Sequence, residues 1–188
     1  MLVPRQPFGV LVLVAATLLL AMSGERAWGQ DTQSAEYRIK AAFLCKFGNY
    51  VEWPPAAFAG DDSPFSIGVL GPQPVADEVA AAARGQTANG RPIAVRRLAP
   101  GDPVDGLHVL FIAGAGGTRQ AEALAAAKDK PVLTVTEAER LSGAVVNFVV
   151  VDDKVKFDVS LPAAERSSLK VSARLLGVAR QVAGKPSS

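Results

Sequence analysis

The sequence predicts an α/β fold, in which a mostly parallel mixed β-sheet carries helices on both faces and ends in a C-terminal β-hairpin plus helix. Short apolar runs at 65–71, 107–112 and 131–135 have the length of buried strands. Helix-forming segments separate these runs, which favours right-handed parallel crossovers. β-forming residues at 144–151 and an alternating run at 154–161, joined by Asp152-Asp153, indicate a hairpin.

Residues 1–29 have the features of a secretory leader, which is not part of the fold. Arg5 supplies the positive charge and an uncharged apolar run follows it. Small residues before the cut favour cleavage after Gly29, with a cut near Ser23 or Gly24 as the alternative. The apolar run is shorter than the about 20 residues that span a membrane, so an uncleaved anchor is the less favoured interpretation. We therefore expect a protein exported to the periplasm.

The mature chain has the size of one domain. Removing the leader from 188 residues leaves 159, which we assign to a folded part at 30–183 and a disordered tail at 184–188. The leader takes two of the 20 basic residues and one of the 18 acidic residues, so the mature chain is nearly neutral. This balance predicts no nucleic-acid binding, and Arg96-Arg97 is interpreted as a solvated strand end.

Cys45 is the only cysteine, which excludes a disulfide framework within one chain. It lies near Leu44 and Phe47 in a predicted apolar helix, and the simplest interpretation is a small buried hydrophobic side chain. An intermolecular disulfide or a redox-sensing thiol is the alternative hypothesis.

The mature chain opens with a helix predicted over 34–50, with Ser34 as its N-cap. Its apolar residues form two adjacent stripes: Tyr37, Ala41, Leu44, Gly48 and Val51 on one, and Ile39, Phe43, Phe47 and Tyr50 on the other. Two stripes predict burial on both sides, one against the core and one against a partner or a second copy. The prolines after Trp53 end the helix, because proline lacks the backbone donor.

Strands and helices then alternate. We predict a strand at 65–71, a helix at 75–84, a turn at Asn89-Gly90 and a second strand at 92–98. The dense apolar run at 107–112 is bounded by glycines, which indicates a central strand buried on both faces.

The second half of the chain follows the same pattern. A glycine loop leads to Thr118, the predicted cap of a helix that ends near Lys128. A strand at 131–135 and a helical turn at 137–141 come next.

The C-terminal part is predicted to be a hairpin and a helix. Strands at 144–151 and 154–161 flank Asp152-Asp153, because tight turns favour Asx residues. Pro162 opens a helical turn, and a final helix is predicted at 171–182.

The chain contains no recognisable catalytic set. His108 is the only histidine, and its position in an apolar strand indicates a core or sheet-end residue rather than a base. Motifs for a serine elbow, a Walker lysine or a zinc protease do not occur. One cysteine and one histidine argue against zinc. We therefore expect no catalytic residues, no metal and no cofactor, and rank a hydrolase last.

The glycine loop is a possible anion site. Gly114, Gly116 and Gly117 follow a strand and precede a helix, where backbone N–H groups can face an anion. A plain strand-to-helix turn is the simpler interpretation, because the third glycine of the dinucleotide fingerprint is missing.

Four blocks of sequence occur in a distinctive order: KAAFLCKFGNYVEWP at 40–54, FSIGVLG at 65–71, HVLFI at 108–112, and a tail block of VKFDVSLPAA and LKVSARLL within 155–176. Together they cover almost all of the mature chain. Their order and spacing resemble the YfiR family of periplasmic proteins.

The resemblance implies a periplasmic α/β domain that forms homodimers and acts without catalysis. The best-known member represses an inner-membrane diguanylate cyclase by binding its periplasmic sensor region, and an outer-membrane lipoprotein sequesters the repressor. Cyclic di-GMP and biofilm formation are the output. The resemblance implies the same partners and role here.

The chain departs from the family in two places. The best-known member has supporting disulfides, whereas this chain has Cys45 alone. The family often has Asn where Ser160 stands, and nearby basic residues are represented by Lys156, with Asp158 two positions on. Lys156 and Asp158 join the glycine loop as candidate ligand-binding residues.

Tyr50, Trp53 and Phe58 are the candidate partner-binding residues, because aromatic side chains anchor interfaces. For Trp53, closure of the end of the core is the alternative interpretation. A second hypothesis for the whole protein is a periplasmic small-ligand-binding role, for a nucleotide, an amino acid or a cell-wall fragment. The glycine loop or a crevice at the strand ends would hold that ligand.

Overall fold

The computed structural model describes residues 24–114, 116–138 and 143–184. It divides into two units at residues 36 and 37, and the second unit contains the sheet. Within the described ranges, no helix combines the length and the apolar character that a membrane span requires.

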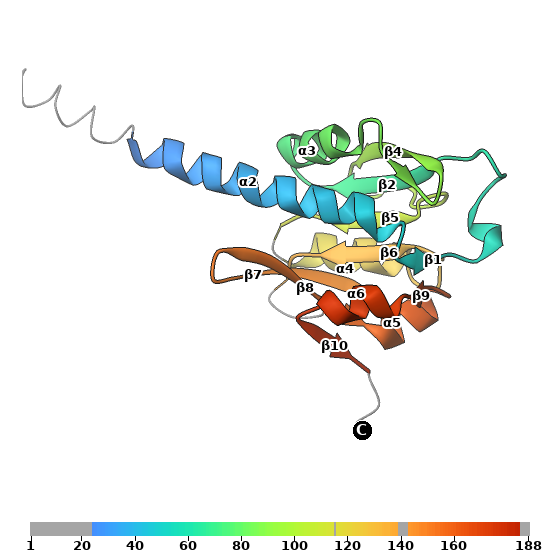
Figure 1. Ribbon diagram of the computed structural model, residues 1–188. Helices are drawn as coiled ribbons and strands as arrows, with labels where there is room; N and C mark the ends of the chain where they lie inside the picture. The colour runs from blue at the N-terminus through green and yellow to red at the C-terminus, as the bar shows by residue number, and fades with distance from the viewer. Residues whose placement is uncertain (1–23, 115, 139–142, 185–188) are drawn as a thin grey trace, which may run out of the picture. The chain divides into compact units, whose positions relative to one another are not determined.

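Helices and strands alternate along the chain (Figure 1). The helices are α2 (Gly24–Phe47), α3 (Gln73–Ala83), α4 (Thr118–Ala126), α5 (Leu161–Arg166) and α6 (Ala173–Val178), with a 3₁₀ turn η1 (Pro55–Ala57). The strands are β1 (Val51–Glu52), β2 (Phe65–Leu70), β3 (Thr87–Ala88), β4 (Arg91–Leu98), β5 (Val109–Ile112), β6 (Leu133–Thr136), β7 (Val146–Val151), β8 (Lys154–Ser160), β9 (Lys170–Val171) and β10 (Gln181–Ala183).

Eight strands form one sheet in the order β10-β8-β7-β6-β5-β2-β4-β3. The pairs β3/β4 and β7/β8 are antiparallel, and the other five pairs are parallel. Strands β1 and β9 form a separate antiparallel pair. The predicted α/β class with a mostly parallel mixed sheet is therefore confirmed.

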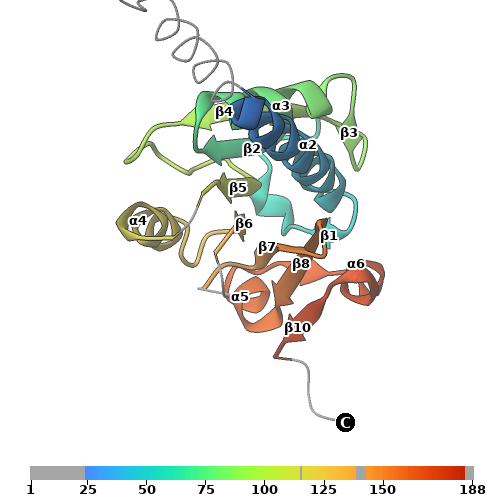
Figure 2. The ribbon, with the colours of Figure 1, turned by 90° about the vertical axis from the view of Figure 1, so that its left-hand side faces the viewer.

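Helices cover both faces of the sheet (Figure 2). Residues 37–47 of α2, together with α3 and α6, lie on one face, and α4 lies on the other. The larger core cluster lies under α2 and α3 and includes Phe47, Phe111, Phe148 and Phe157. A smaller cluster lies under α4.

All four residues of strand β5 are buried. It pairs with β2 on one side and β6 on the other. The prediction of a central strand at 107–112 is thus confirmed.

Both predicted turns form. Asn89 and Gly90 have φ values of 49° and 80° and join β3 to β4. Asp152 and Asp153 have φ values of 51° and 57° and join β7 to β8, which confirms the C-terminal hairpin.

The bounds of the first helix differ from the prediction. Helix α2 begins at Gly24, so Ser34 lies inside it and is not its N-cap. No proline occurs between Gly24 and Ser34 to interrupt the helix. The helix ends at Phe47, where Asn49 and Tyr50 donate to the carbonyls of Lys46 and Phe47 in a tighter turn.

The cap of α4 was also predicted wrongly. Gly117 occupies the N-cap position with a φ of 111°, and Thr118 is the first residue of the helix. Gly117 has no side chain, so no side-chain hydrogen bond caps α4. Glycine adopts this backbone conformation at little cost, which places the helix start one residue earlier.

The final helix is much shorter than predicted. Helix α6 ends at Val178, and the chain continues as β10, parallel to β8. Arg180 N–H donates to the carbonyl of Phe157 at 2.8 Å. Residues 181–183 therefore pair with the otherwise free edge of β8 and do not continue the helix.

Two further predictions fall largely outside the described residues. Residues 137 and 138 are not helical, and 139–142 are not among the described residues. The same holds for residues 185–188 of the tail.

Gly48 allows α2 to pack closely on the sheet. A Cβ at this position would lie 2.5 Å from the Ala88 Cβ, whereas a Cβ at Gly177 would meet no atom within 4 Å. We expect Gly48→Ala to lower the free energy of unfolding by about 1–3 kcal/mol through overpacking. Gly177→Ala is the matched control and should raise it by about 0.5 kcal/mol.

Urea unfolding of the two variants and the wild type measures this difference. Equal midpoints for Gly48→Ala and the wild type would contradict the close packing of α2 at this position.

Candidate functional site

Trp53 joins the end of α2 to the sheet. Its ring packs edge-on against Phe65 at 5.0 Å between centroids, and its Nε1 donates to the carbonyl of His108 at 3.1 Å. The side chain is half-buried and packs against the larger core cluster. These contacts favour the interpretation of Trp53 as a residue that closes the core.

A stack of rings holds the loop between Trp53 and β2. The ring of His108 lies between those of Phe58 and Phe65, at centroid distances of 4.2 and 5.2 Å. Arg91 covers the other side of Phe58 at 4.1 Å and donates from Nη1 to the carbonyls of Gly60 and Ser63 at 2.8 Å. Phe58 is therefore an internal layer of this loop.

His108 is buried and has a structural role. Its Nδ1 accepts a hydrogen bond from the N–H of Ser66 at 3.0 Å. Its Nε2 makes no hydrogen bond of normal geometry with a described residue. Burial lowers the pKa of His108, an effect that the backbone of Ala57 partly offsets. A neutral imidazole with its acceptor already used is a poor general base.

The three predicted partner-binding residues separate into two groups. Trp53 and Phe58 meet at His108. Tyr50 makes no ring contact with either of them among the described residues, and 37% of its surface is exposed. Its carbonyl accepts the N–H of Ser172, the N-cap of α6, at 2.9 Å.

Exposed apolar side chains occur on α2, on the turn that follows it and on α6. Residues 37–47 of α2 and helix α6 lie on the same face of the sheet (Figures 1 and 2). Ile39 is 47% exposed and Val178 is 69% exposed. We call the surface formed by Ile39, Tyr50 and Val178 the α2–α6 face. Phe43 and Phe47 of the same predicted stripe turn inward, so the second stripe of the helix is divided between core and surface.

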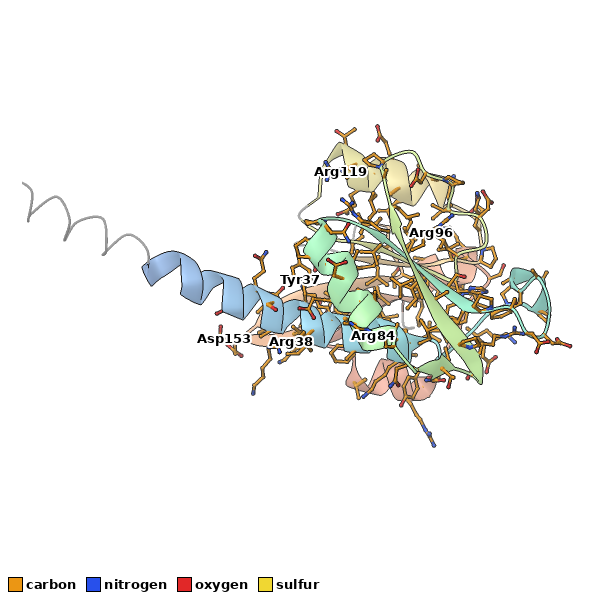
Figure 3. All side chains as sticks on the ribbon, turned by 90° about the horizontal axis from the view of Figure 1, so that it is seen from above. Tyr37, Arg38, Arg84, Arg96, Arg119 and Asp153 are labelled. Atoms are coloured by element: carbon orange, nitrogen blue, oxygen red, sulfur yellow. The ribbon has the colours of Figure 1, made fainter. Side chains whose placement is uncertain are left out.

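A buried ionic cluster, not predicted from the sequence, lies at the carboxyl ends of β5 and β6. Lys40 Nζ lies 2.6 Å from Glu137 Oε1, and both side chains are less than 10% exposed. Glu137 Oε2 accepts from the hydroxyl of Tyr37 at 3.2 Å and from the N–H of Gly114 at 2.6 Å. Tyr37 is labelled on α2 in Figure 3.

This cluster connects α2 to two strand ends. The Lys40 ammonium also lies 5.0 Å from the ring of Tyr37 and 6.0 Å from that of Phe148. The carboxylate of Glu137 has a partner on each oxygen, so the arrangement is a structural tie. A lysine among apolar helix residues was the available sequence signal, but its partner is 97 positions away.

The predicted ligand residues do not converge. Gly114 donates its N–H to Glu137, and Gly116 and Gly117 are exposed before α4. Lys156 and Asp158 lie on β8, and strands β6 and β7 separate β8 from β5. This geometry does not support one ligand site built from these five residues.

Asp158 has a partner of its own. Its carboxylate is buried and accepts from the guanidinium of Arg180, with Nε 2.8 Å from Oδ1. This hydrogen bond raises the pKa of Arg180 further above its ordinary value. Asp158 therefore fixes β10 against β8, while Lys156 remains exposed.

Cys45 is buried, and desolvation raises the pKa of its thiol to about 11. A thiolate is therefore scarce at neutral pH, which agrees with the simpler interpretation of this residue. Within the described ranges, no three His, Cys, Asp or Glu side chains come together in a group that could hold a metal ion.

Trp53 and Tyr50 should respond differently to truncation. We expect Trp53→Ala to lower the free energy of unfolding by about 3 kcal/mol, because it removes a packed ring and the bond to His108. Tyr50→Ala should cost less than about 1 kcal/mol, because the side chain is partly exposed. Chemical unfolding measures both, and equal effects would contradict the separation of core from surface.

The Lys40–Glu137 tie gives a second prediction. Lys40→Met should lower the free energy of unfolding by about 3–5 kcal/mol, because it leaves a buried carboxylate without its cation. Lys130→Met breaks the exposed pair with Asp105 and is the control, with an expected cost below about 1 kcal/mol.

The double variant Lys40→Met with Glu137→Gln should recover at least half of that loss, because no buried charge remains. If the losses in unfolding free energy of the two single variants simply add in the double variant, the coupling between Lys40 and Glu137 is contradicted.

A family model described as YfiR/HmsC-like matches residues 37–180, which contain β1 to β9 and both of the structural ties around His108 and Glu137. No curated protein matches the chain. The family match covers well over half of the sequence, and the chain therefore belongs to the YfiR/HmsC-like family.

Proposed function

We propose that this protein is a non-enzymatic periplasmic signalling regulator that binds the periplasmic sensor region of an inner-membrane diguanylate cyclase. By repressing that cyclase it lowers cyclic di-GMP and limits biofilm formation. Membership of the YfiR/HmsC-like family over residues 37–180 is the observation that carries this proposal.

The chemistry of the described residues supports a role in binding. The His108 ring holds a loop, the Cys45 thiol is buried, and the Glu137 carboxylate is held by Lys40, Tyr37 and Gly114. The side chains of His108, Cys45 and Glu137 thus each have a structural role.

The α2–α6 face is the surface that we assign to the cyclase. Ile39 of α2, Tyr50 of the turn after α2 and Val178 of α6 expose apolar area, and the two helices lie on one face of the sheet. Tyrosine is enriched at the centre of protein interfaces, and burial of exposed apolar side chains such as Ile39 and Val178 favours association. Trp53 and Phe58 pack against His108 instead, so we do not include them among the direct contacts with the cyclase.

Export and further partners complete the proposal. Residues 1–29 direct the chain to the periplasm, with cleavage after Gly29. A homodimer and an outer-membrane lipoprotein that sequesters the regulator are the additional partners expected from the resemblance.

Co-purification tests the cyclase contact. The exported protein, tagged at its C-terminus, is incubated with detergent-solubilised inner membranes, and bound proteins are identified by mass spectrometry. We expect recovery of a membrane protein with a periplasmic sensor and a cyclase domain. Ile39→Asp and Tyr50→Asp should each reduce recovery at least tenfold, because they place a charge in an apolar interface.

Arg84→Asp, an exposed change on α3, is the matched control and should leave recovery unchanged. Equal recovery with all three variants would contradict the assigned surface. Failure to recover any cyclase with the folded wild type would contradict the proposed function.

A further inference from the structure

The strand order places a topological switch point at β2. The connection through α3 leads from β2 to β4 on one side, and β5 lies on the other side of β2. Helix α3 packs into the larger core cluster and α4 packs on the smaller one, so the two helices cover opposite faces. In open α/β sheets, ligands bind in the crevice outside the carboxyl ends of the strands at such a point.

A hollow exists at this place. Its wider part has a volume of about 550 Å³ and lies outside the carboxyl ends of β2 and β4, where Leu70, Gly71, Leu98 and Ala99 line it. An adjoining part of about 240 Å³ continues under α4 towards Val104 and Leu110. Both parts share Leu70, Leu98 and Arg119, so they form one crevice. Pockets of about 300–1,000 Å³ are typical of small-ligand sites.

The crevice has an apolar floor. Leu70, Leu98, Val104 and Leu110 belong to the smaller core cluster and line its inner part. Such a floor accepts an apolar ring or short chain, because burial removes that group from water.

Two arginines line the wider part, Arg97 from β4 and Arg119 from the first turn of α4. Neither forms an ion pair with a residue in the described part of the chain. Arg97 was interpreted from the sequence as part of a solvated strand end. The structure places it with Arg119 on one hollow, and a guanidinium pair of this kind matches carboxylate or phosphate oxygens.

The acidic residues of the crevice do not cancel this charge at its wider part. Asp102 lines it, but its Oδ2 accepts from the N–H of Ala99 at 2.8 Å and closes the loop after β4. Glu122 lines the narrower part only. The wider part therefore has two guanidinium groups and one carboxylate, that of Asp102, which accepts the N–H of Ala99.

We propose that this crevice binds a small organic anion, in which a carboxylate or phosphate group is joined to an apolar group. Arg97 and Arg119 bind the anionic group, and the floor formed by Leu70 and Leu98 receives the apolar group. The site lies at the carboxyl edge of the sheet and shares no residue with the α2–α6 face. It does not depend on the proposed function.

Calorimetric titration of the exported protein tests the proposal with four probes: phenylacetate, phenyl phosphate, benzyl alcohol and inorganic phosphate. We expect at least one of the two aromatic anions to bind with a Kd of about 1 mM or below, a range open to ligands of this size. Benzyl alcohol and inorganic phosphate should bind at least tenfold more weakly, because each lacks one half of the ligand. Binding of only phenylacetate or only phenyl phosphate supports the proposal and identifies the anionic group.

Arg97→Gln and Arg119→Gln should each weaken binding about tenfold, because each removes a charge-assisted hydrogen bond. Arg84→Gln is the matched control: it removes an exposed arginine from the far end of α3, away from Arg119 (Figure 3). The two test arginines are exposed, so their variants should fold, which circular dichroism verifies. Absence of binding by both aromatic anions, or equal binding by all three variants, would overturn the proposal.

Discussion

The packing of residues 37–47 of α2 on the C-terminal hairpin is the constraint on which the rest of the structure depends. Phe43 lies 5.5 Å from Phe157, and Phe47 lies 6.0 Å from Phe148, measured between ring centroids. These contacts join the beginning of the folded unit to β7 and β8, about a hundred positions later in the chain. The position of α2 then fixes where β1, Trp53 and the following loop begin.

Several weaker contacts depend on that arrangement. Because α2 ends over the sheet, Val51 reaches Val171 in the β1–β9 pair, and Tyr50 can accept the N–H of Ser172. Trp53 then reaches the carbonyl of His108. The Lys40–Glu137 pair adds a polar tie at the opposite edge, where a misplaced helix would leave a buried charge unpaired.

The sequence was sufficient for elements that depend on local patterns. The run at 107–112 predicted β5, and Asp152-Asp153 predicted the hairpin, because apolar density and Asx turns act over a few residues. Contacts between distant residues were not predictable in this way. The end of α6 depends on Arg180 meeting Asp158 and on the free edge of β8, so a helical pattern at 171–182 gave the wrong structure.

The candidate site shows the same division. An aromatic cluster at 50–58 was visible in the sequence, but the assignment of its members depended on the fold. Tyr50 is on the surface, whereas Trp53 and Phe58 meet His108, which is adjacent to them only because β2 and β5 pair. The glycine loop after β5 was likewise visible in the sequence. Its Gly114 N–H donates to Glu137, which follows the neighbouring strand β6, and this contact could not be predicted from local sequence.

The surface that we assign to the cyclase, on α2 and α6, is separate from the crevice at the carboxyl edge of the sheet. The first exposes apolar side chains, which suits a protein partner, and the second is a hollow lined by arginines, which suits a small anion. A regulator with both surfaces has the means to couple a small molecule to a membrane partner.

Cellular cyclic di-GMP, measured by mass spectrometry in the native host with and without this gene, tests the central claim most directly. The account predicts that deletion raises cyclic di-GMP severalfold. The full-length gene should restore the low level, whereas a version without residues 1–29 should not, because it stays in the cytoplasm. An unchanged level after deletion, or full restoration by the version without a leader, would contradict the claim that the protein represses a cyclase from the periplasm.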